Sequence, residues 1–347
     1  MPHPPFIWTL VIVTIGACDG VASTTMPKRP ANTSRRFTVD HRGRQIHLVE
    51  VNWKSLTNAE QWILLRSDAH HDSKYCLRHM ELKHLREAVD RDALVLDLGD
   101  CLDLMQGVSD RRSSKSSLRS NLLSTNYFDR VIDEAAEFYT QTYNGKQLAD
   151  QFVLIGQGNH ESAWLKFHEV CPTQNLVRAI KSRAPKTQVG AGAYGGYVHL
   201  TIRYNNAYRT FTIRYAHGAS SGGQMTMGAL DIRRMGAWIV DADMIAIGHT
   251  HDSMVAPIVR ERFITQNGDY RIKHPETMFV RCGTYKDEFG QTEGMGWAVE
   301  KGGGPKPLCA KWVRLYPVWE WRKGGKNGGV SRGRGVWTLG CDIFDAK

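Results

Sequence analysis

The sequence predicts an α/β protein, in which helices pack on the outside of a β-sheet. Five short apolar runs rich in Leu, Ile and Val have the length of buried strands. Amphipathic helical patterns lie between those runs, and alternation of strand and helix is typical of this fold class. The length of 347 residues and the hydrophobic content of 41% suffice to bury the core of one large domain or two small ones.

Strands are predicted where the apolar runs are short and bounded by polar residues. In chain order these runs are 62–66, 93–98, 152–155, 211–215 and 244–247. Alternating segments predict two hairpins, one at 197–204 and 208–215, the other at 263–266 and 270–273 around an Asn267-Gly268 turn. Two more strands are predicted at 278–282 and 311–316.

Helices are predicted where apolar residues recur on one helical face. Leu77, Met80, Leu85 and Val89 form such a face in the first case. The other three patterns fall within 128–139, 176–180 and 230–238. All four lie between predicted strands, so each is expected to cover a face of the sheet.

Composition divides the chain into three parts. Residues 1–48 form an apolar and then basic segment, 49–320 hold the predicted domain, and 321–347 form a Gly-rich basic tail. The net charge of +10 is concentrated in the flanks, with +5 in 26–48 and +7 in 306–334, which leaves the rest at about −2. Two interpretations stay open: the flanks bind a polyanion such as nucleic acid, or they are solvated tails.

Cysteine usage and apolar content bear on the location of the protein. The seven cysteines are scattered and never spaced as CxxC, which favours a reducing compartment and predicts a cytoplasmic protein. Export is the alternative, because residues 6–17 have the length of a signal sequence and 15–18 resemble a lipoprotein cleavage site. No Lys or Arg precedes them, and Met26 could equally be the translation start. No apolar run reaches the ~18–20 residues that a membrane span needs.

Residues typical of metal sites follow directly after each of the five predicted strands. The motifs are Asp68-Ala69-His70, Gly99-Asp100-Cys101-Leu102-Asp103, Gly158-Asn159-His160-Glu161, His217-Gly218 and Gly248-His249-Thr250-His251. One D-x-H triplet is expected about once by chance, but five ordered motifs at strand ends are not. Because functional groups gather at the carboxyl ends of the strands in open α/β sheets, we expect these side chains to converge.

These five motifs, in this order, resemble those of the calcineurin-like metallophosphoesterase superfamily. That superfamily includes calcineurin-type phosphatases, cyclic-nucleotide diesterases and SbcD-like nucleases, and the resemblance covers roughly residues 60–285. It implies a four-layer αββα sandwich, in which two mixed β-sheets are flanked by helices. Within the superfamily, residues 111–116, 194–197 and 283–288 look like uncharacterised phage-borne and bacterial members.

The resemblance also implies two divalent metal ions and a role for each motif. One ion would be held by Asp68, His70, Asp100 and His251, and the second by Asn159, His217 and His249, with Asp100 bridging the two. For these carboxylate, amide and imidazole ligands manganese is the first expectation, and iron, zinc, nickel or magnesium are the alternatives. A hydroxide bridging the two ions would attack phosphorus in line.

His160 is the candidate general acid, which would protonate the leaving alkoxide. Asp103 would orient His160, although an Asp at this position could also cap a loop. Protein phosphatases of the superfamily place an Arg directly after the second Asp of GDxxD, whereas this chain has Leu104, which argues against a phosphoserine or phosphothreonine phosphatase. The candidates for binding substrate phosphate are Arg111, Arg112 and Lys115, unless that loop is simply solvated.

Neither the natural substrate nor the oligomeric state follows from the sequence, but the reaction class does. We expect a metal-dependent hydrolase that cleaves phosphate mono- or diesters. A DNA or RNA nuclease is the alternative within this chemistry: the basic flanks favour it, and the near-neutral core does not. A metal-stabilised binding or structural module is the alternative of another class, and it would require a crippled site.

Overall fold

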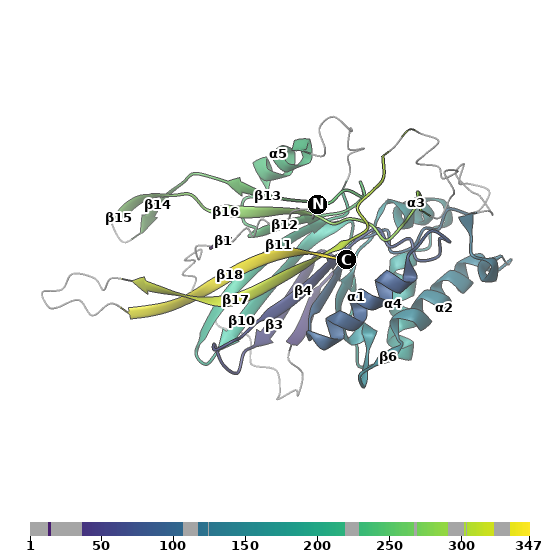
Figure 1. The fold of residues 1–347 in the computed structure, drawn as a ribbon, viewed down its shortest axis with the longest axis horizontal. Helices are drawn as coiled ribbons and strands as arrows, with labels where there is room; N and C mark the ends of the chain where they lie inside the picture. Colours follow the sequence, from purple (N-terminus) through teal and green to yellow (C-terminus); the bar gives the residue numbers. More distant parts are fainter. Residues whose placement is uncertain are drawn as a thin grey trace, which may run out of the picture.

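The computed structural model describes residues 13–14, 37–106, 117–123, 125–218, 229–266, 269–290, 302, 304–322 and 334–347. These residues form two seven-stranded β-sheets, two two-stranded ribbons and several helices (Figure 1). Both large sheets contain parallel and antiparallel neighbours. The predicted α/β class is therefore confirmed at the level of two mixed sheets with helices.

The first sheet has the strand order β1-β18-β17-β4-β5-β8-β9. Its strands are β1 (Val13–Thr14), β4 (Gln61–Arg66), β5 (Leu94–Asp97), β8 (Phe152–Ile155), β9 (Gly190–Ala191), β17 (Ala310–Arg322) and β18 (Arg334–Ala346). From β4 to β9 the strands run parallel, whereas β17 is antiparallel to both β4 and β18. β5 and β8 are buried at every residue, which explains why their sequences are apolar apart from Asp97, whose carboxylate pairs with the buried Arg66 at 2.8 Å.

The second sheet has the strand order β13-β16-β12-β11-β10-β3-β2. Its strands are β2 (Phe37–Arg42), β3 (Ile46–Asn52), β10 (Gly195–Tyr204), β11 (Ala207–Ala216), β12 (Met244–Ile247), β13 (Met254–Val259) and β16 (Glu276–Arg281). β11, β12 and β16 are parallel neighbours, and β3 is parallel to β10. Between β13 and β16 the chain forms a protruding hairpin, β14 (Arg262–Gln266) with β15 (Asp269–Lys273) (Figure 1).

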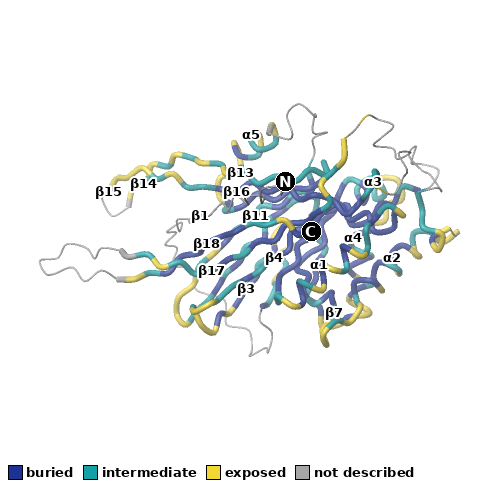
Figure 2. The backbone as a smooth tube through the Cα atoms, viewed as in Figure 1, coloured by how far each residue is buried: buried dark blue, intermediate teal, exposed yellow. Residues whose placement is uncertain are grey.

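The two sheets face each other across a shared apolar core. Leu65 and Leu96 of the first sheet belong to the same buried cluster as Leu200 and Ile213 of the second. The helices are α1 (Arg78–Asp90), α2 (Tyr127–Tyr139), α3 (Asn159–His168), α4 (Pro172–Arg183) and α5 (Ala229–Trp238). α1, α2 and α4 share a second buried cluster with the other face of the first sheet, and α5 packs on the second sheet. The strands in the centre of Figure 2 are accordingly buried, and exposed residues lie on the helices, the loops and the β14–β15 hairpin.

The elements that carry the motifs agree with those predicted. The five apolar runs correspond to β4, β5, β8, β11 and β12, and the four predicted helices to α1, α2, α4 and α5. α3 was not predicted, because only His160 and Glu161 of its residues are buried and it therefore has no apolar stripe.

Both expected segment boundaries fall inside strands. Residue 48 lies within β3 and residue 321 within β17. Residues 37–48 belong to the second sheet and 334–346 to the first, so neither stretch is a flank. β3 buries every second residue, and because one of these is His47 while Ile46 and Leu48 are not buried, its sequence gave a weaker signal than the apolar runs.

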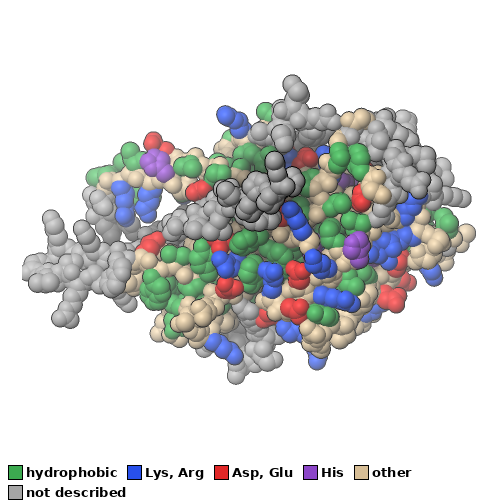
Figure 3. Space-filling model, viewed as in Figure 1, with side chains coloured by type: hydrophobic (Ala, Val, Ile, Leu, Met, Phe, Trp, Pro, Cys, Tyr) green, Lys and Arg blue, Asp and Glu red, His purple; other side chains and the backbone are tan. Residues whose placement is uncertain are grey.

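Several sequence-based expectations lie outside the described residues. They concern Arg111, Arg112 and Lys115, the Asn267-Gly268 turn and the basic stretch 323–333. On the face shown in Figure 3, Lys and Arg side chains are interspersed with Asp and Glu. One such pair joins two helices, since Arg78 of α1 lies 2.6 Å from Glu134 of α2. Among the described helices, none is long and apolar enough to cross a bilayer.

Candidate metal centre

The five motifs lie at strand ends of both sheets. In the first sheet, Asp68 and His70 follow β4, Asp100 follows β5, and Asn159 follows β8; in the second, His217 follows β11, and His249 and His251 follow β12. Within each sheet, the strands that carry motifs are parallel to one another and therefore end at the same edge. Because the sheets face each other, their loops meet at one point.

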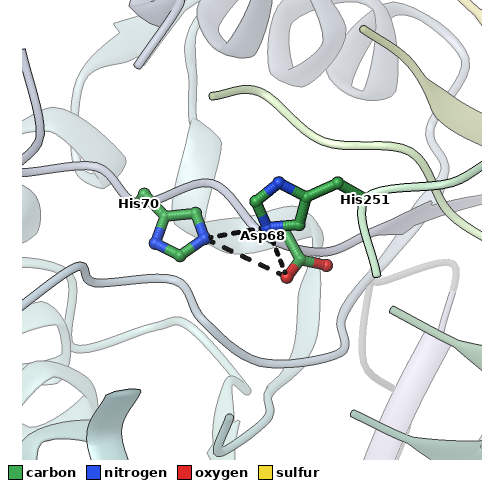
Figure 4. Close-up of side chains that lie close together, drawn as sticks. All are labelled: Asp68, His70 and His251. Atoms are coloured by element: carbon green, nitrogen blue, oxygen red, sulfur yellow. Dashed lines mark hydrogen bonds and ion pairs between the residues drawn. The ribbon is translucent and has the colours of Figure 1, made fainter. Parts of the chain in front are cut away.

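Asp68, His70 and His251 form a first group of candidate ligands (Figure 4). The Nε2 atoms of His70 and His251 lie 3.3 Å apart, and His251 Nε2 lies 3.3 Å from Asp68 Oδ1. His70 Nε2 is 4.0 Å from the same oxygen. Asp68 and His70 are buried and His251 is partly exposed, so three donor atoms face one small volume close to solvent.

Asp100, Asn159, His217 and His249 form a second group. His217 Nε2 lies 3.1 Å from Asp100 Oδ2 and 3.0 Å from Asn159 Oδ1. His249 Nδ1 lies 2.8 Å from the same amide oxygen. This group therefore offers one carboxylate, one amide oxygen and two imidazoles.

The two groups adjoin each other. His217 Nε2 lies 3.9 Å from Asp68 Oδ1, and the His249 amide donates to Asp68 Oδ2 at 2.9 Å. Ligand atoms of His70, Asp100 and His160 also lie within 4.8 Å of one another. The structure thus brings all seven candidate ligands and His160 together, with Asp100 next to both groups.

Five candidate ligands have a left-handed backbone, which residues other than glycine rarely adopt. The φ angles are 54° at Asp68, 47° at His70, 50° at Asp100, 74° at His249 and 59° at His251. Each such residue costs on the order of 1 kcal/mol and persists only where its surroundings fix it, and such strain clusters at ligand sites. The backbone of these loops is therefore shaped to direct the side chains.

Buried carboxylates outside the two groups hold the loops in place. Glu161 accepts hydrogen bonds from the amides of Asp100, Leu102 and Gly158 at 3.2, 3.0 and 2.8 Å, which fastens the loop after β5 to the start of α3. Burial and the nearby Asp100 raise the pKa of Glu161 to about 8. The Asp72 carboxylate accepts hydrogen bonds from the backbone amides of Asp103 and Leu104, at 2.6 and 3.1 Å.

Negative charge dominates the electrostatics of the centre. Burial would lower the pKa of His217, but Asp100 and Asp68 outweigh that effect and raise it to about 9. Burial would raise the pKa of Asp68, but His217 and His251 lower it to about 2. Burial would likewise raise the pKa of Asp100, but His217 and His160 hold it well below its usual value, so both carboxylates remain ionised and attract positive charge to the site.

The donor set fits divalent cations. Asp68 Oδ1 is buried, and imidazole nitrogens of His70, His217 and His251 lie within 4.0 Å of it. A buried, ionised carboxylate is costly unless positive charge pairs with it. Oxygen and imidazole donors suit manganese, iron, zinc or nickel.

A neighbouring group fits a cation less well. Donor atoms of His71, Cys76 and Glu81 lie within 4.8 Å of one another. Glu81, however, already forms a buried ion pair with Arg66 at 2.7 Å and contacts His71 Nδ1 at 2.8 Å. Its charge is thus neutralised by the protein, and we interpret this group as structural.

Asp103, the residue expected to orient His160, contacts it mainly through its backbone carbonyl and not through its carboxylate. His160 Nδ1 contacts the backbone carbonyl of Asp103, and Asp103 Oδ1 is 3.8 Å away from it. That oxygen instead lies 2.8 Å from His70 Nδ1 and 3.0 Å from Lys286 Nζ. Burial would raise the pKa of Asp103, but Lys286 and His70 hold it well below its usual value.

Three residues that shape the centre were missed by sequence reasoning. Lys286 follows β16, a sixth strand that ends beside β12, so its place after a predicted strand was an available signal. Glu161 is part of the Gly158–Glu161 motif but had been given no role. For Asp72 the sequence offered no signal beyond its position near His70.

Comparison with known proteins adds little to this description. No protein-family model and no curated protein matches the chain. Among solved structures, it is similar to "GAP50 the anchor in the inner membrane complex of Plasmodium", with a TM-score of 0.37 and 10% identity over 75% of this chain and 82% of that chain. A similarity at this level supports no statement about function.

Proposed function

We propose that this protein is a binuclear metal-dependent phosphoesterase with the four-layer αββα fold of the metallophosphoesterases. The observation that carries the proposal is the convergence of seven oxygen and nitrogen donors, from five strand ends in two facing sheets, into two adjoining groups. Two-metal phosphoesterases need such paired sites, because two neighbouring ions act on one phosphate. The helices on the outer faces of the sheets agree with the proposed layers.

The proposed ligands follow the two groups. Asp68, His70, Asp100 and His251 would hold one ion, and Asn159, His217 and His249 the other. Two divalent ions, manganese first and iron, zinc, nickel or magnesium otherwise, would lower the pKa of water and polarise the phosphate oxygens. The left-handed backbone of Asp68, His70 and Asp100 fixes their direction before any ion binds.

His160 is the proposed proton donor to the leaving alkoxide. Its Nδ1 contacts the carbonyl oxygen of Asp103, which only accepts, so Nδ1 carries hydrogen and Nε2 is the atom that exchanges a proton. The His160 amide donates to Asp100 Oδ1 at 2.9 Å, which fixes the residue against the second group. Nε2 lies 3.8 Å from Asp100 Oδ2, at the edge of the proposed metal sites.

A metal and substrate panel tests this function. The purified protein would be loaded with Mn²⁺, Mg²⁺, Zn²⁺ or Ni²⁺ and assayed on para-nitrophenyl phosphate, its bis ester, cyclic nucleotides and single- and double-stranded DNA. We expect two ions per chain by elemental analysis and hydrolysis of at least one ester. Preferential cleavage of DNA would favour a nuclease. Bound metal without hydrolysis of any ester would favour a metal-stabilised module, and absence of metal binding would contradict the proposal.

Asp100→Asn is the sharpest variant for this test. Because Asp100 adjoins both groups, loss of its charge should abolish metal loading and hydrolysis together. Asp92→Asn is the matched control. Asp92 lies in the turn before β5 and has the same φ of 50° as Asp100, but its carboxylate pairs with Lys146. The control should retain both properties, and a fully loaded Asp100→Asn protein would show that Asp100 is not a shared ligand.

A further inference from the structure

A buried lysine adjoins the centre without belonging to either group of ligands. Lys286 is 9% exposed. Its Nζ lies 3.0 Å from Asp103 Oδ1 and 3.3 Å from Glu288 Oε1. A buried ammonium group needs such partners, so the position of Lys286 and that of the Asp103 carboxylate depend on each other.

Hydrogen bonds fix the segment that carries Lys286. The Thr284 hydroxyl and the Tyr285 amide both donate to the carbonyl oxygen of Asp68, at 2.9 and 3.1 Å. The Lys286 amide donates to the Thr284 hydroxyl oxygen at 3.0 Å. The lysine is therefore attached to the loop that carries the first candidate ligand.

Asp103 Oδ1 lies within reach of two histidines as well as of Lys286. His70 Nδ1 is at 2.8 Å and His160 Nδ1 at 3.8 Å. An ionised carboxylate only accepts, so the nitrogen that contacts it carries the hydrogen, and the other ring nitrogen keeps its lone pair. For His70 that other nitrogen is Nε2, which faces His251 and Asp68.

We propose that Lys286 is a positioning residue, which anchors the Asp103 carboxylate so that His70 keeps hydrogen on Nδ1 and presents Nε2 as a metal ligand. Carboxylate partners of this kind set the tautomer and ring orientation of ligating histidines. The inference rests on the proposed function, since it treats His70 as a ligand. Without Lys286, the Asp103 carboxylate would be free to turn from His70 towards His160.

Lys286→Met tests the inference, with Lys286→Arg as the conservative variant. Lys311→Met is the matched control, because Lys311 is also buried, at 4% exposure, and pairs with Asp345 rather than with Asp103. Calorimetric titration with Mn²⁺ should show binding weakened ~10–100-fold at one of the two sites in Lys286→Met. Lys286→Arg should restore most of the affinity, and Lys311→Met should bind as the wild type does even if its Tm falls.

A second measurement needs no metal. Nitrogen-15 NMR of the metal-free protein should show a single His70 tautomer with hydrogen on Nδ1, and that tautomer should be lost in Lys286→Met. Unchanged Mn²⁺ affinity in Lys286→Met would overturn the role of Lys286, as would weakened affinity with an unchanged His70 tautomer. Either result would leave the phosphoesterase proposal standing. Equal losses in Lys286→Met and Lys311→Met would also overturn it, and a wild type that binds no Mn²⁺ would overturn both.

Discussion

His70 and His160 lie side by side in the centre but contact different acceptors. Their ring centroids are 4.8 Å apart, and both Nδ1 atoms point towards Asp103. His70 contacts the carboxylate and His160 the backbone carbonyl. A carboxylate partner fixes the tautomer of an imidazole and strengthens it as a metal ligand, whereas His160 is held through a neutral carbonyl. Two adjacent histidines can thus have separate roles in one centre.

His160→Asn should separate catalysis from metal binding. We expect the variant to keep its Mn²⁺ content while turnover falls ~10²–10⁴-fold, the usual contribution of a general acid. Esters whose leaving group needs no proton, such as nitrophenolate, should be affected least. Elemental analysis and steady-state kinetics on nitrophenyl and alkyl esters measure both effects, and loss of metal from the variant would make His160 a ligand instead.

The candidate ligands could be predicted from the sequence, but the partner of Asp103 could not. Asp68, His70 and Asp100 come within four residues of the ends of two largely apolar strands, so their place in the fold followed from local sequence alone. The contact between Asp103 and Lys286 joins residues 183 positions apart. Which of several nearby donors a carboxylate contacts depends on the docking of separate loops, and no local pattern reports it.

At the scale of elements, the loop after β5 and the start of α3 are packed against each other. A Cβ atom at Gly158 would lie 2.1 Å from Asp100 Oδ1 and 2.3 Å from Asp100 N. At Gly99, where φ is 114°, a Cβ atom would lie 2.7 Å from the backbone nitrogen of Gly158. The Gly158-Asn159-His160-Glu161 motif therefore requires glycine for close approach as well as its ligands for chemistry.

Gly158→Ala should disrupt the centre through this contact. The methyl group must displace backbone and Asp100 together, which we expect to cost ~1–3 kcal/mol and to reduce metal content. Gly304→Ala is the control, because nothing lies within 4 Å of a Cβ there. Thermal unfolding and elemental analysis measure the outcome, and wild-type metal content in Gly158→Ala would show that the turn can adapt.

The β2–β3 hairpin is joined to the rest of the protein by two histidines, the partly buried His41 and the buried His47. His41 Nδ1 lies 2.7 Å from His47 Nδ1, so one of the two nitrogens must lack hydrogen. His47 Nε2 lies 3.2 Å from the hydroxyl of Tyr215, and His41 Nε2 lies 2.8 Å from the carbonyl of Gln188. These contacts connect β2 and β3 to β11 and to the residues before β9, and they cannot all form when both imidazoles are protonated.

Acid should therefore weaken the protein at this hairpin. Burial and the neighbouring His41 lower the pKa of His47 from 6.5 to about 4, and burial also lowers that of His41. The unfolded chain thus binds the proton more tightly, so the stabilisation is complete above pH 6.5 and is lost as the pH falls towards 4. For His47 alone the loss at pH 5 is about 2 kcal/mol.

Urea unfolding at pH 7.5 and pH 5 measures this effect. His47→Gln should be less stable than the wild type at pH 7.5 but should lose less stability on acidification. The comparison between the two proteins matters, because Asp97 and Glu161 also have raised pKa values, about 6 and about 8. An identical pH dependence in both proteins would exclude the histidine pair as its source.

The candidate ligands come from both sheets. Asp68, His70, Asp100 and Asn159 come from the first sheet, and His217, His249 and His251 from the second. An ion held by ligands of both sheets binds only while the sheets are docked. The elements of each sheet were largely predictable, but this juxtaposition depends on strand pairings such as β4 with β17 that no local pattern contains.

Metal should accordingly stabilise the folded protein. By linkage, Mn²⁺ at 100 times its Kd should raise the free energy of unfolding by about 2.7 kcal/mol per site. Urea unfolding of the wild type with Mn²⁺ or with a chelator measures this gain. Asp100→Asn should show no gain, whereas Asp92→Asn should match the wild type; equal stability of the wild type with and without Mn²⁺ would contradict a centre that joins the sheets.

The strand order also constrains how this protein folds. β4 comes early in the chain, yet one of its two neighbours, β17, lies at residues 310–322. Until β17 pairs with it, β4 is an open edge with unpaired N–H and C=O groups beside a strongly apolar sequence. Closing so long a loop is slow, and exposed edges of this kind pair with other chains. Refolding yield should therefore fall as protein concentration rises, because the half-built first sheet aggregates through β4.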